Sequence, residues 1–209
     1  MFSGIVEAVV PALRGEAKSG LYRLVLRRPA EFTDIKGGDS IAVDGACLTV
    51  EEFDHESMTF ALAAETLKVL RWNPDQLLSR TFNLERSLRF GDRLHGHLVS
   101  GHVDALGEVL RAEQDGESLF LDVKVPASLR SYVWKKGSLA IHGVSLTINE
   151  LKDDVVSVCL IPETQKRTNL SKLKVGDSVH LESDMIARAV VRALETGVAT
   201  SAQAKEDRP

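Results

Sequence analysis

The chain has 209 residues, of which 44% are hydrophobic and 27% charged, an ordinary balance for a globular protein. Its net charge of −4 argues against nucleic-acid binding, which uses a basic face, and two cysteines are too few for a disulfide scaffold. No apolar run approaches the roughly 18 residues of a membrane span, and residues 1–7 lack the basic start of a signal peptide. We therefore expect a cytoplasmic protein of one or two domains, with no membrane partner.

Most of the chain is predicted to form short strands separated by turns about ten residues apart, which is the all-β pattern. In chain order, clear candidates are residues 21–26, 58–62, 119–125 and 155–161. Asp44-Gly45 is typical of a two-residue hairpin turn, because both residue types tolerate positive φ. His142-Gly143 predicts the same turn in the second half.

Helical signals are few. Residues 127–133, which follow a proline, predict a short helix between strands. Residues 184–194 predict a longer helix, capped by Ser183 or Asp184 and apolar at i, i+4 and i+8. That apolar stripe either packs on its own domain or drives self-association. Residues 196–209, rich in Ala, Thr, Ser and charge, are interpreted as a disordered tail.

The chain contains two copies of one unit. Residues 38–50 recur as 136–148, so that Cys47 and Ser145 are equivalent positions 98 residues apart. Three more matches keep the same order at offsets of 97 or 98: residues 3–8 with 100–105, 65–66 with 163–164, and 84–85 with 181–182. A period of about 97 residues can enclose its own core, unlike the shorter repeats of solenoids. We expect two similar domains (1–97 and 98–183), a helix (184–195) and the tail, with two nearly equivalent ligand pockets.

The strand after each hairpin turn has one apolar and one polar face, because side chains alternate along a strand. Leu48 and Val50 share a face with core character, whereas Cys47 and Thr49 lie on the other. In the second copy, Ser145 and Thr147 take these places. The polar faces are candidate pocket walls. The alternatives are that Cys47 is a small buried apolar side chain and that the threonines only favour β-structure. Cys159 has no such match and is expected in the core.

Several motifs identify a family resemblance. They are Met-Phe-Ser-Gly-Ile-Val-Glu at 1–7, Asn-Leu-Glu-Arg at 83–86, Gly-His-Leu-Val-Ser-Gly-His-Val-Asp at 96–104, Ile-Pro-Glu-Thr at 161–164, and the paired Cys-Leu-Thr and Ser-Leu-Thr strands. From residue 1 to about 194, the sequence closely resembles the riboflavin synthase alpha chain.

The resemblance implies two six-stranded antiparallel β-barrels in tandem, followed by a C-terminal helix that assembles a homotrimer. Each barrel would bind one 6,7-dimethyl-8-ribityllumazine. A four-carbon unit would pass from one lumazine to the other, giving riboflavin and 5-amino-6-(D-ribitylamino)uracil, without a metal or an organic cofactor. The active site would lie between the first barrel of one subunit and the second barrel of its neighbour. Association with lumazine synthase, the enzyme that makes the substrate, stays open.

The differences between the two copies suggest catalytic roles. By resemblance, Ser145 and Asp184 form a dyad that activates a hydroxyl or water, with Thr147 beside them; Asp184 can also cap the helix. His102 is placed to move protons, since its ordinary pKa lies near neutrality. Cys47 is a candidate for proton or nucleophile chemistry at the acceptor lumazine. The expected substrate contacts, which include some of these residues, are Phe2, Gly4, Ile5, Val6, Ser40, Cys47, Leu48, Thr49, Ala61, Ala64, Glu65, Thr66, Gly101, His102, Val103, Lys136, Ser145, Leu146, Thr147, Leu160, Ile161, Pro162, Glu163 and Thr164.

The sequence departs from the family pattern at a few positions. His142 replaces a usual Asp, Leu70 a frequent Thr and His95 a usual Gly, and residues 71–80 lack the Gly-Asp turn found at 176–177. These changes bear on the first pocket and on subunit packing. His95, His97 and His102 raise the question of a zinc site, but no acidic or thiol partner has a helpful spacing, so we expect no metal.

Three functions compete. The first is the enzyme, and the second is a non-catalytic lumazine or flavin carrier of the antenna type, which shares the duplicated fold. The third is an unrelated cysteine hydrolase built on Cys47 and His102, for which no oxyanion motif is recognisable. The enzyme is favoured because Ser145, Thr147, Asp184 and His102 of the second copy are all present beside Cys47. A pure carrier needs only one good pocket.

Overall fold

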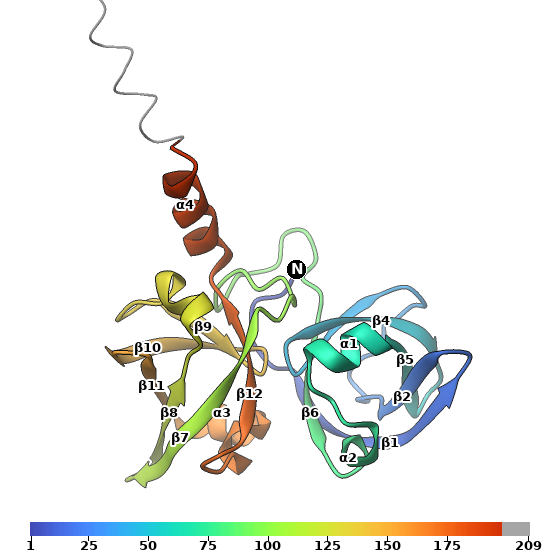
Figure 1. Cartoon of the computed structure of the whole chain (residues 1–209). Helices are drawn as coiled ribbons and strands as arrows, with labels where there is room; N and C mark the ends of the chain where they lie inside the picture. Colours follow the sequence, from blue (N-terminus) through green and yellow to red (C-terminus); the bar gives the residue numbers. More distant parts are fainter. Residues whose placement is uncertain (198–209) are drawn as a thin grey trace, which may run out of the picture.

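A computed structural model describes residues 1–197, and residues 198–209, most of the predicted tail, lie outside the described part (Figure 1). Two closed antiparallel barrels stand side by side. The first, in the order β1-β2-β5-β4-β3-β6, contains β1 (Ala8–Lys18), β2 (Leu21–Arg27), β3 (Ser40–Val43), β4 (Ala46–Phe53), β5 (Ser57–Ala63) and β6 (Thr81–Arg86). The second, in the order β10-β11-β8-β7-β12-β9, contains β7 (Ala105–Asp115), β8 (Ser118–Lys124), β9 (Ser138–Ile141), β10 (Val144–Lys152), β11 (Val155–Leu160) and β12 (Ser178–Ser183). The expected pair of six-stranded barrels is confirmed.

The two predicted hairpin turns are present and meet each other. Asp44 and Gly45 have φ of 45° and 82°, and His142 and Gly143 have φ of 47° and 77°, as a type I′ turn requires. A Cβ atom built on either glycine would lie 2.7 Å from the backbone nitrogen of the other. Glycine is therefore needed twice at these positions, for the turn conformation and for the contact between barrels.

Each barrel has its own apolar core, but each core also accepts a residue from the other repeat. Val6, which precedes β1, packs in the core of the second barrel. Val103, which precedes β7, packs against the core of the first. The segments at 2–6 and 99–103, here called the crossed segments, thus exchange between barrels. They pass each other at Phe2 and Val99, whose backbones form two mutual hydrogen bonds of 2.8 and 3.0 Å.

The two helices that the sequence predicts are present. Residues 127–132 form a 3₁₀ helix, η1 (Ala127–Tyr132), and α4 (Met185–Glu195) begins after Asp184, whose Oδ1 accepts from the backbone N–H of Ile186 at 2.8 Å. The remaining short helices are α1 (Ala64–Val69), α2 (Pro74–Leu77), α3 (Pro162–Arg167) and η2 (Asn169–Lys172). No helix in the described residues is long and apolar enough to cross a membrane.

The departures from the family pattern lie mostly in the contact between the barrels. Asn83 donates its backbone N–H to Oδ1 of Asp44 at 2.9 Å, and the equivalent His180 donates its own to Nδ1 of His142 at 3.4 Å. Asn83 also donates through Nδ2 to the carbonyl oxygen of His142, and Nδ1 of His180 lies 2.8 Å from that of Asp44. A His–His pair therefore takes the place of the Asp–Asn pair in the second repeat. The segment 71–80 folds as α2 and buries Trp72.

Candidate functional site

A cavity of about 250 Å³ opens on the outer face of the first barrel. Cys47 of β4 lines it together with Glu65 and Thr66 of α1. The opposite wall is the second crossed segment, which contributes Gly101, His102 and Val103. This pocket is therefore built from both repeats.

The crossed segments extend the strands that carry Cys47 and Ser145. The backbone N–H of Cys47 donates to the carbonyl oxygen of Gly101 at 2.8 Å, and that of Ser145 donates to Gly4 at 2.7 Å. Both glycines have positive φ, 75° at Gly4 and 81° at Gly101. A Cβ atom would lie 2.6 Å from Cβ of Ser145 or 2.5 Å from Cβ of Cys47. Only glycine permits this approach.

The crossing changes which residues share a pocket. His102 belongs to the second repeat, yet it lines the pocket of Cys47 in the first barrel. Ile5, its counterpart, follows Gly4 and thus accompanies Ser145 of the second barrel. The polar residues of the second repeat are therefore divided between the Cys47 pocket and the surroundings of Ser145, which their positions in the sequence do not show.

Ser145 has a histidine partner. Its Oγ lies 2.7 Å from Nδ1 of His97, a residue of the linker (87–97) between the barrels. Burial lowers the pKa of His97, and the negative charge of Asp184 partly opposes this effect. Nε2 of His97 is buried and has no partner among the described residues. A neutral His97 can accept the hydroxyl proton of Ser145.

Asp184 acts on this pair through its charge. The contacts of residues 1–197 include no direct hydrogen bond between Asp184 and Ser145, and Oδ1 of Asp184 caps α4. His97, which the sequence indicates only as part of a motif and of a possible zinc site, is therefore a further candidate residue of the Ser145 site. At an offset of 97 its counterpart is Leu194, an apolar residue of α4, so comparison of the repeats does not single out His97.

The linker packs closely against Ser145. A Cβ atom on Gly96 would be 2.1 Å from the carbonyl oxygen of Ser3 and 2.7 Å from Cβ of Ser145. The backbone N–H of His97 donates to the same Ser3 oxygen at 3.2 Å. The linker thus forms a wall of the Ser145 site, and Gly96 is needed for the fit.

The other residues expected at the substrate fall into three groups. Residues of the first group are exposed or half-buried and lie on the outer face of a barrel or next to that face. They are Ser40, Thr49, Ala61, Ala64, Glu65, Thr66, Lys136, Thr147, Ile161, Pro162, Glu163 and Thr164. In the second, the side chains point into a barrel and only the backbone can face a pocket, at Leu48, Leu146 and Leu160. The third, Phe2 and Val6, is buried where the segments cross. Phe2 packs with Ala42, Val99 and Ala140, next to Cys47.

Cys159 is not a core residue, contrary to expectation. It is half-buried and alternates along β11 with Val158 and Leu160, which are fully buried. The pairing of Ile148 with Val158 places Cys159 next to Thr147, on the outer face. The strand pattern Val-Ser-Val-Cys-Leu contained this signal, because Cys159 shares its face with Ser157.

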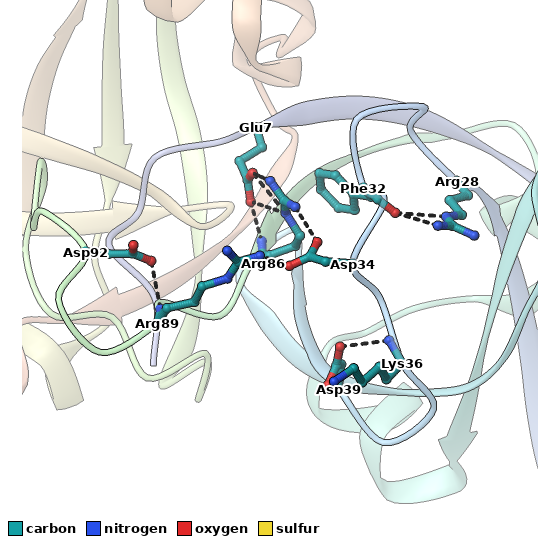
Figure 2. Close-up of polar contacts among 9 residues, drawn as sticks. All are labelled: Glu7, Arg28, Phe32, Asp34, Lys36, Asp39, Arg86, Arg89 and Asp92. Carbon is teal, nitrogen blue, oxygen red and sulfur yellow. Dashed lines mark hydrogen bonds and ion pairs between the residues drawn. The ribbon is translucent and has the colours of Figure 1, made fainter.

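Ion pairs fix the ends of the crossed segments (Figure 2). Glu7 accepts the backbone N–H of Arg86 at 2.7 Å, and the guanidinium of Arg86 lies between Glu7 and Asp34. Arg86 and Arg89 lower the pKa of Asp34 to about 2. The cluster borders a groove of about 540 Å³ beside the linker.

The second repeat has the matching arrangement. The carboxylate of Asp104, equivalent to Glu7, accepts from the backbone N–H and the hydroxyl of Ser183, both at 2.8 Å. Arg188 of α4 pairs with Asp104 at 2.6 Å. Each crossed segment is therefore followed by an acid tied to the last strand of its own barrel.

Comparison with known proteins agrees with this duplicated architecture. A model of the lumazine binding domain matches the chain twice, at residues 3–87 and 100–184. Riboflavin synthase of Mycobacterium tuberculosis is 39% identical over 201 residues, which cover 94% of this chain and 99% of that protein. The chain belongs to the riboflavin synthase family. Riboflavin synthases of Chlamydia trachomatis and Bacillus subtilis are 38% and 37% identical, covering 91% and 93% of this chain and 93% and 90% of theirs.

Solved structures share the fold. LumP complexed with riboflavin superposes with a TM-score of 0.80 at 22% identity, over 88% of this chain and 99% of that one. LumP complexed with 6,7-dimethyl-8-(1'-D-ribityl) lumazine gives a TM-score of 0.77 at 21% identity, with the same coverage. At this identity the likeness shows the two-barrel fold alone.

Proposed function

We propose that this chain is a riboflavin synthase. It converts two molecules of 6,7-dimethyl-8-ribityllumazine into riboflavin and 5-amino-6-(D-ribitylamino)uracil by transfer of a four-carbon unit. Relatives that bear this name, at 34–39% identity over about nine-tenths of the chain, support the proposal. The atoms of the two substrates equal those of the two products, so the reaction needs no added oxidant or reductant.

The observation that carries the proposal is a pair of equivalent strand positions, Cys47 and Ser145, with different chemistry around each. Cys47 and His102 face one pocket. At the equivalent position of the second barrel, Ser145 pairs with His97, with Asp184 nearby. A dismutation needs two sites for one molecule, because holding both reactants in place can lower the barrier by about 7–11 kcal/mol. It also needs the sites to differ, because one molecule gives the carbon unit and the other receives it.

The residues suggest a division of roles. His97 takes a proton from Ser145, or from a water in its place, for addition to the donor lumazine. Cys47 and His102 face the acceptor, where one of them removes a proton from its acidic 7-methyl group. Such acid–base steps contribute about 10²- to 10⁴-fold. Thr49 and Thr147, exposed on the same faces, can hydrogen-bond the polar edge of each ring.

A homotrimer completes the proposed site. Helix α4 projects away from both barrels (Figure 1) and leaves Ile186, Val190 and Leu194 more than half exposed. Such an apolar stripe on a helix is what self-association covers. In the assembly that we propose, the first barrel of one copy faces the second barrel of another, so that a donor and an acceptor lumazine meet between subunits.

The test is direct. Purified protein is incubated with the lumazine alone, and riboflavin is followed by absorbance. One riboflavin and one pyrimidine formed per two lumazines support the enzyme, and Ser145→Ala should remove most of the rate. Tight fluorescent binding of the lumazine without turnover would contradict the proposal and identify a carrier of the antenna type.

A further inference from the structure

Two buried glutamates lie behind the pockets and take no part in the chemistry proposed above. Glu85 lies in β6 and Glu182 in β12, at equivalent positions 97 residues apart. Their exposed fractions are only 5% and 3%. No cationic side chain pairs with either of them among the described residues. Their partners are backbone N–H groups and serine hydroxyls of the crossed segments.

The contacts are the same in both repeats. Glu85 accepts from the backbone N–H of Ser3 at 2.6 Å, from its hydroxyl at 2.8 Å and from the N–H of Gly4 at 2.9 Å. Glu182 accepts from the N–H of Ser100 at 2.6 Å, from its hydroxyl at 2.7 Å and from the N–H of Gly101 at 2.9 Å. Consecutive N–H groups that converge on one anion form a nest, which the positive φ of the glycine creates.

Each nest adjoins a candidate site, the Cys47 pocket at Gly101 and Ser145 at Gly4. The carbonyl oxygen of Gly101 accepts from Cys47, and the side chain of the next residue, His102, faces the same cavity. The carbonyl oxygen of Gly4 accepts from Ser145. The carboxylate thus holds one side of each glycine while its other side contacts the strand of the opposite barrel. The acids Glu7 and Asp104 then fix the far ends.

From this geometry we infer that Glu85 and Glu182 are positioning residues that act in crossed fashion. Glu182 of the second barrel positions Gly101 and His102 in the Cys47 pocket of the first barrel. Glu85 of the first barrel positions Gly4 and Ile5 at Ser145 of the second. The positioning of the crossed segments follows from the contacts of the two carboxylates, and its effect on turnover rests on the proposed function.

Glutamine is the informative substitution. It nearly matches glutamate in volume, but its NH₂ group replaces one acceptor oxygen and faces a backbone N–H. The segment must shift to separate these two donors, since an unpaired buried donor is costly. Glu182→Gln should therefore loosen residues 99–103, and Glu85→Gln should loosen residues 2–6, each with the rest of its barrel intact.

The thiol of Cys47 reports on one pocket and needs no substrate. In a Cys159→Ser background it is the only thiol, and its rate of alkylation by iodoacetamide reflects how closely Gly101 covers it. We expect Glu182→Gln to change that rate by about fivefold or more through local opening, and Glu85→Gln to change it by less than about twofold. Glu182→Asp, which keeps a carboxylate, should fall between Glu182→Gln and the parent.

Circular dichroism and thermal unfolding establish that the variants are folded. If Glu182→Gln does not fold, Ser100→Ala removes the hydroxyl bond to Glu182 and also the acceptor of the His102 backbone N–H, so it should act in the same direction, with Ser3→Ala as its counterpart in the first repeat. Equal effects of Glu85→Gln and Glu182→Gln on Cys47, or no effect of either, would overturn the crossed assignment. Turnover of the parent protein is measured separately, so failure of the enzyme proposal is distinguishable from failure of this one.

Discussion

His97 and Ser145 belong to different parts of the chain, yet Nδ1 of His97 lies 2.7 Å from Oγ of Ser145. If His97 acts as the base of this pair, His97→Gln keeps a hydrogen-bonding side chain but removes the base. We expect kcat to fall by about 10²- to 10⁴-fold with a smaller change in KM. Steady-state riboflavin formation measures both. A kcat within threefold of the parent would show that another group takes the proton.

The pH profile gives an independent check on His97. Burial lowers its pKa below the ordinary value of 6.5, so the ring is neutral at pH 7 and can accept a proton. The rate should therefore stay level when the pH drops from 7.5 to about 6.5, and decline only at more acid pH. Measurement of kcat in overlapping buffers tests this. A decline that begins above pH 7 would contradict the assignment, because it requires a raised pKa.

His142 makes stability depend on pH. It is fully buried, and its pKa is held well below 6.5 by burial and by the nearby His180 and Arg80. The unfolded chain binds a proton near pH 6.5 and the folded chain does not, so acidification favours unfolding. His142→Asn keeps an acceptor for the His180 N–H but does not titrate. As the pH falls below 6.5, the parent should lose up to about 1.4 kcal/mol per pH unit more than this variant.

Urea unfolding at pH 7.5, 6.5 and 5.5 makes that comparison. Burial raises the pKa values of Asp44 and Glu85, so these two groups favour folding as the pH falls. Their contribution is common to both proteins and cancels in the difference. Parallel stability curves for the parent and His142→Asn would mean that His142 takes up a proton as readily in the folded chain as in the unfolded one.

Gly101 tests the close approach of the crossed segment. Gly101→Ala places a Cβ atom 2.5 Å from Cβ of Cys47 at a φ of 81°. Gly20 is a matched control, because its φ is 76° and nothing lies within 4 Å of its Cβ position. Gly20→Ala should cost about 1 kcal/mol for the backbone conformation alone. Gly101→Ala should add about 1–3 kcal/mol of overpacking, measured by chemical unfolding. Equal costs would mean that the segment moves away without resistance.

The repeat made most of the fold predictable. Strands and hairpin turns depend on local patterns, and each repeat contains its own turn sequence, Asp44-Gly45 in the first and His142-Gly143 in the second. The partition of the site was not predictable, because periodicity shows which face of a strand is polar but not which barrel a segment contacts. His102 therefore appeared to accompany Ser145, whereas it lies with Cys47.

Two further residues show why the site was harder to predict than the fold. His97 lies in the linker, where no strand alternation exists, and its pairing with Ser145 depends on the path of the chain between barrels. Cys159 is expected in the core from its apolar character, but strand alternation places it on the outer face. The pairing of His97 depends on long-range placement, which local patterns do not encode, whereas the outer-face position of Cys159 follows from strand alternation.

The apolar face of α4 gives the last prediction. Ile186 and Val190 are 59% and 54% exposed, and a glutamate at each would place charges in any interface that covers them. Ile186→Glu with Val190→Glu should convert the proposed trimer into monomers in light scattering, with Arg192→Glu, a charge change at a polar position of the same helix, as control. Because the proposed site lies between subunits, turnover should be lost together with the trimer, while the melting temperature of the barrels changes little. Full activity in a monomeric variant would place the whole reaction within one chain and contradict the assembly proposed here.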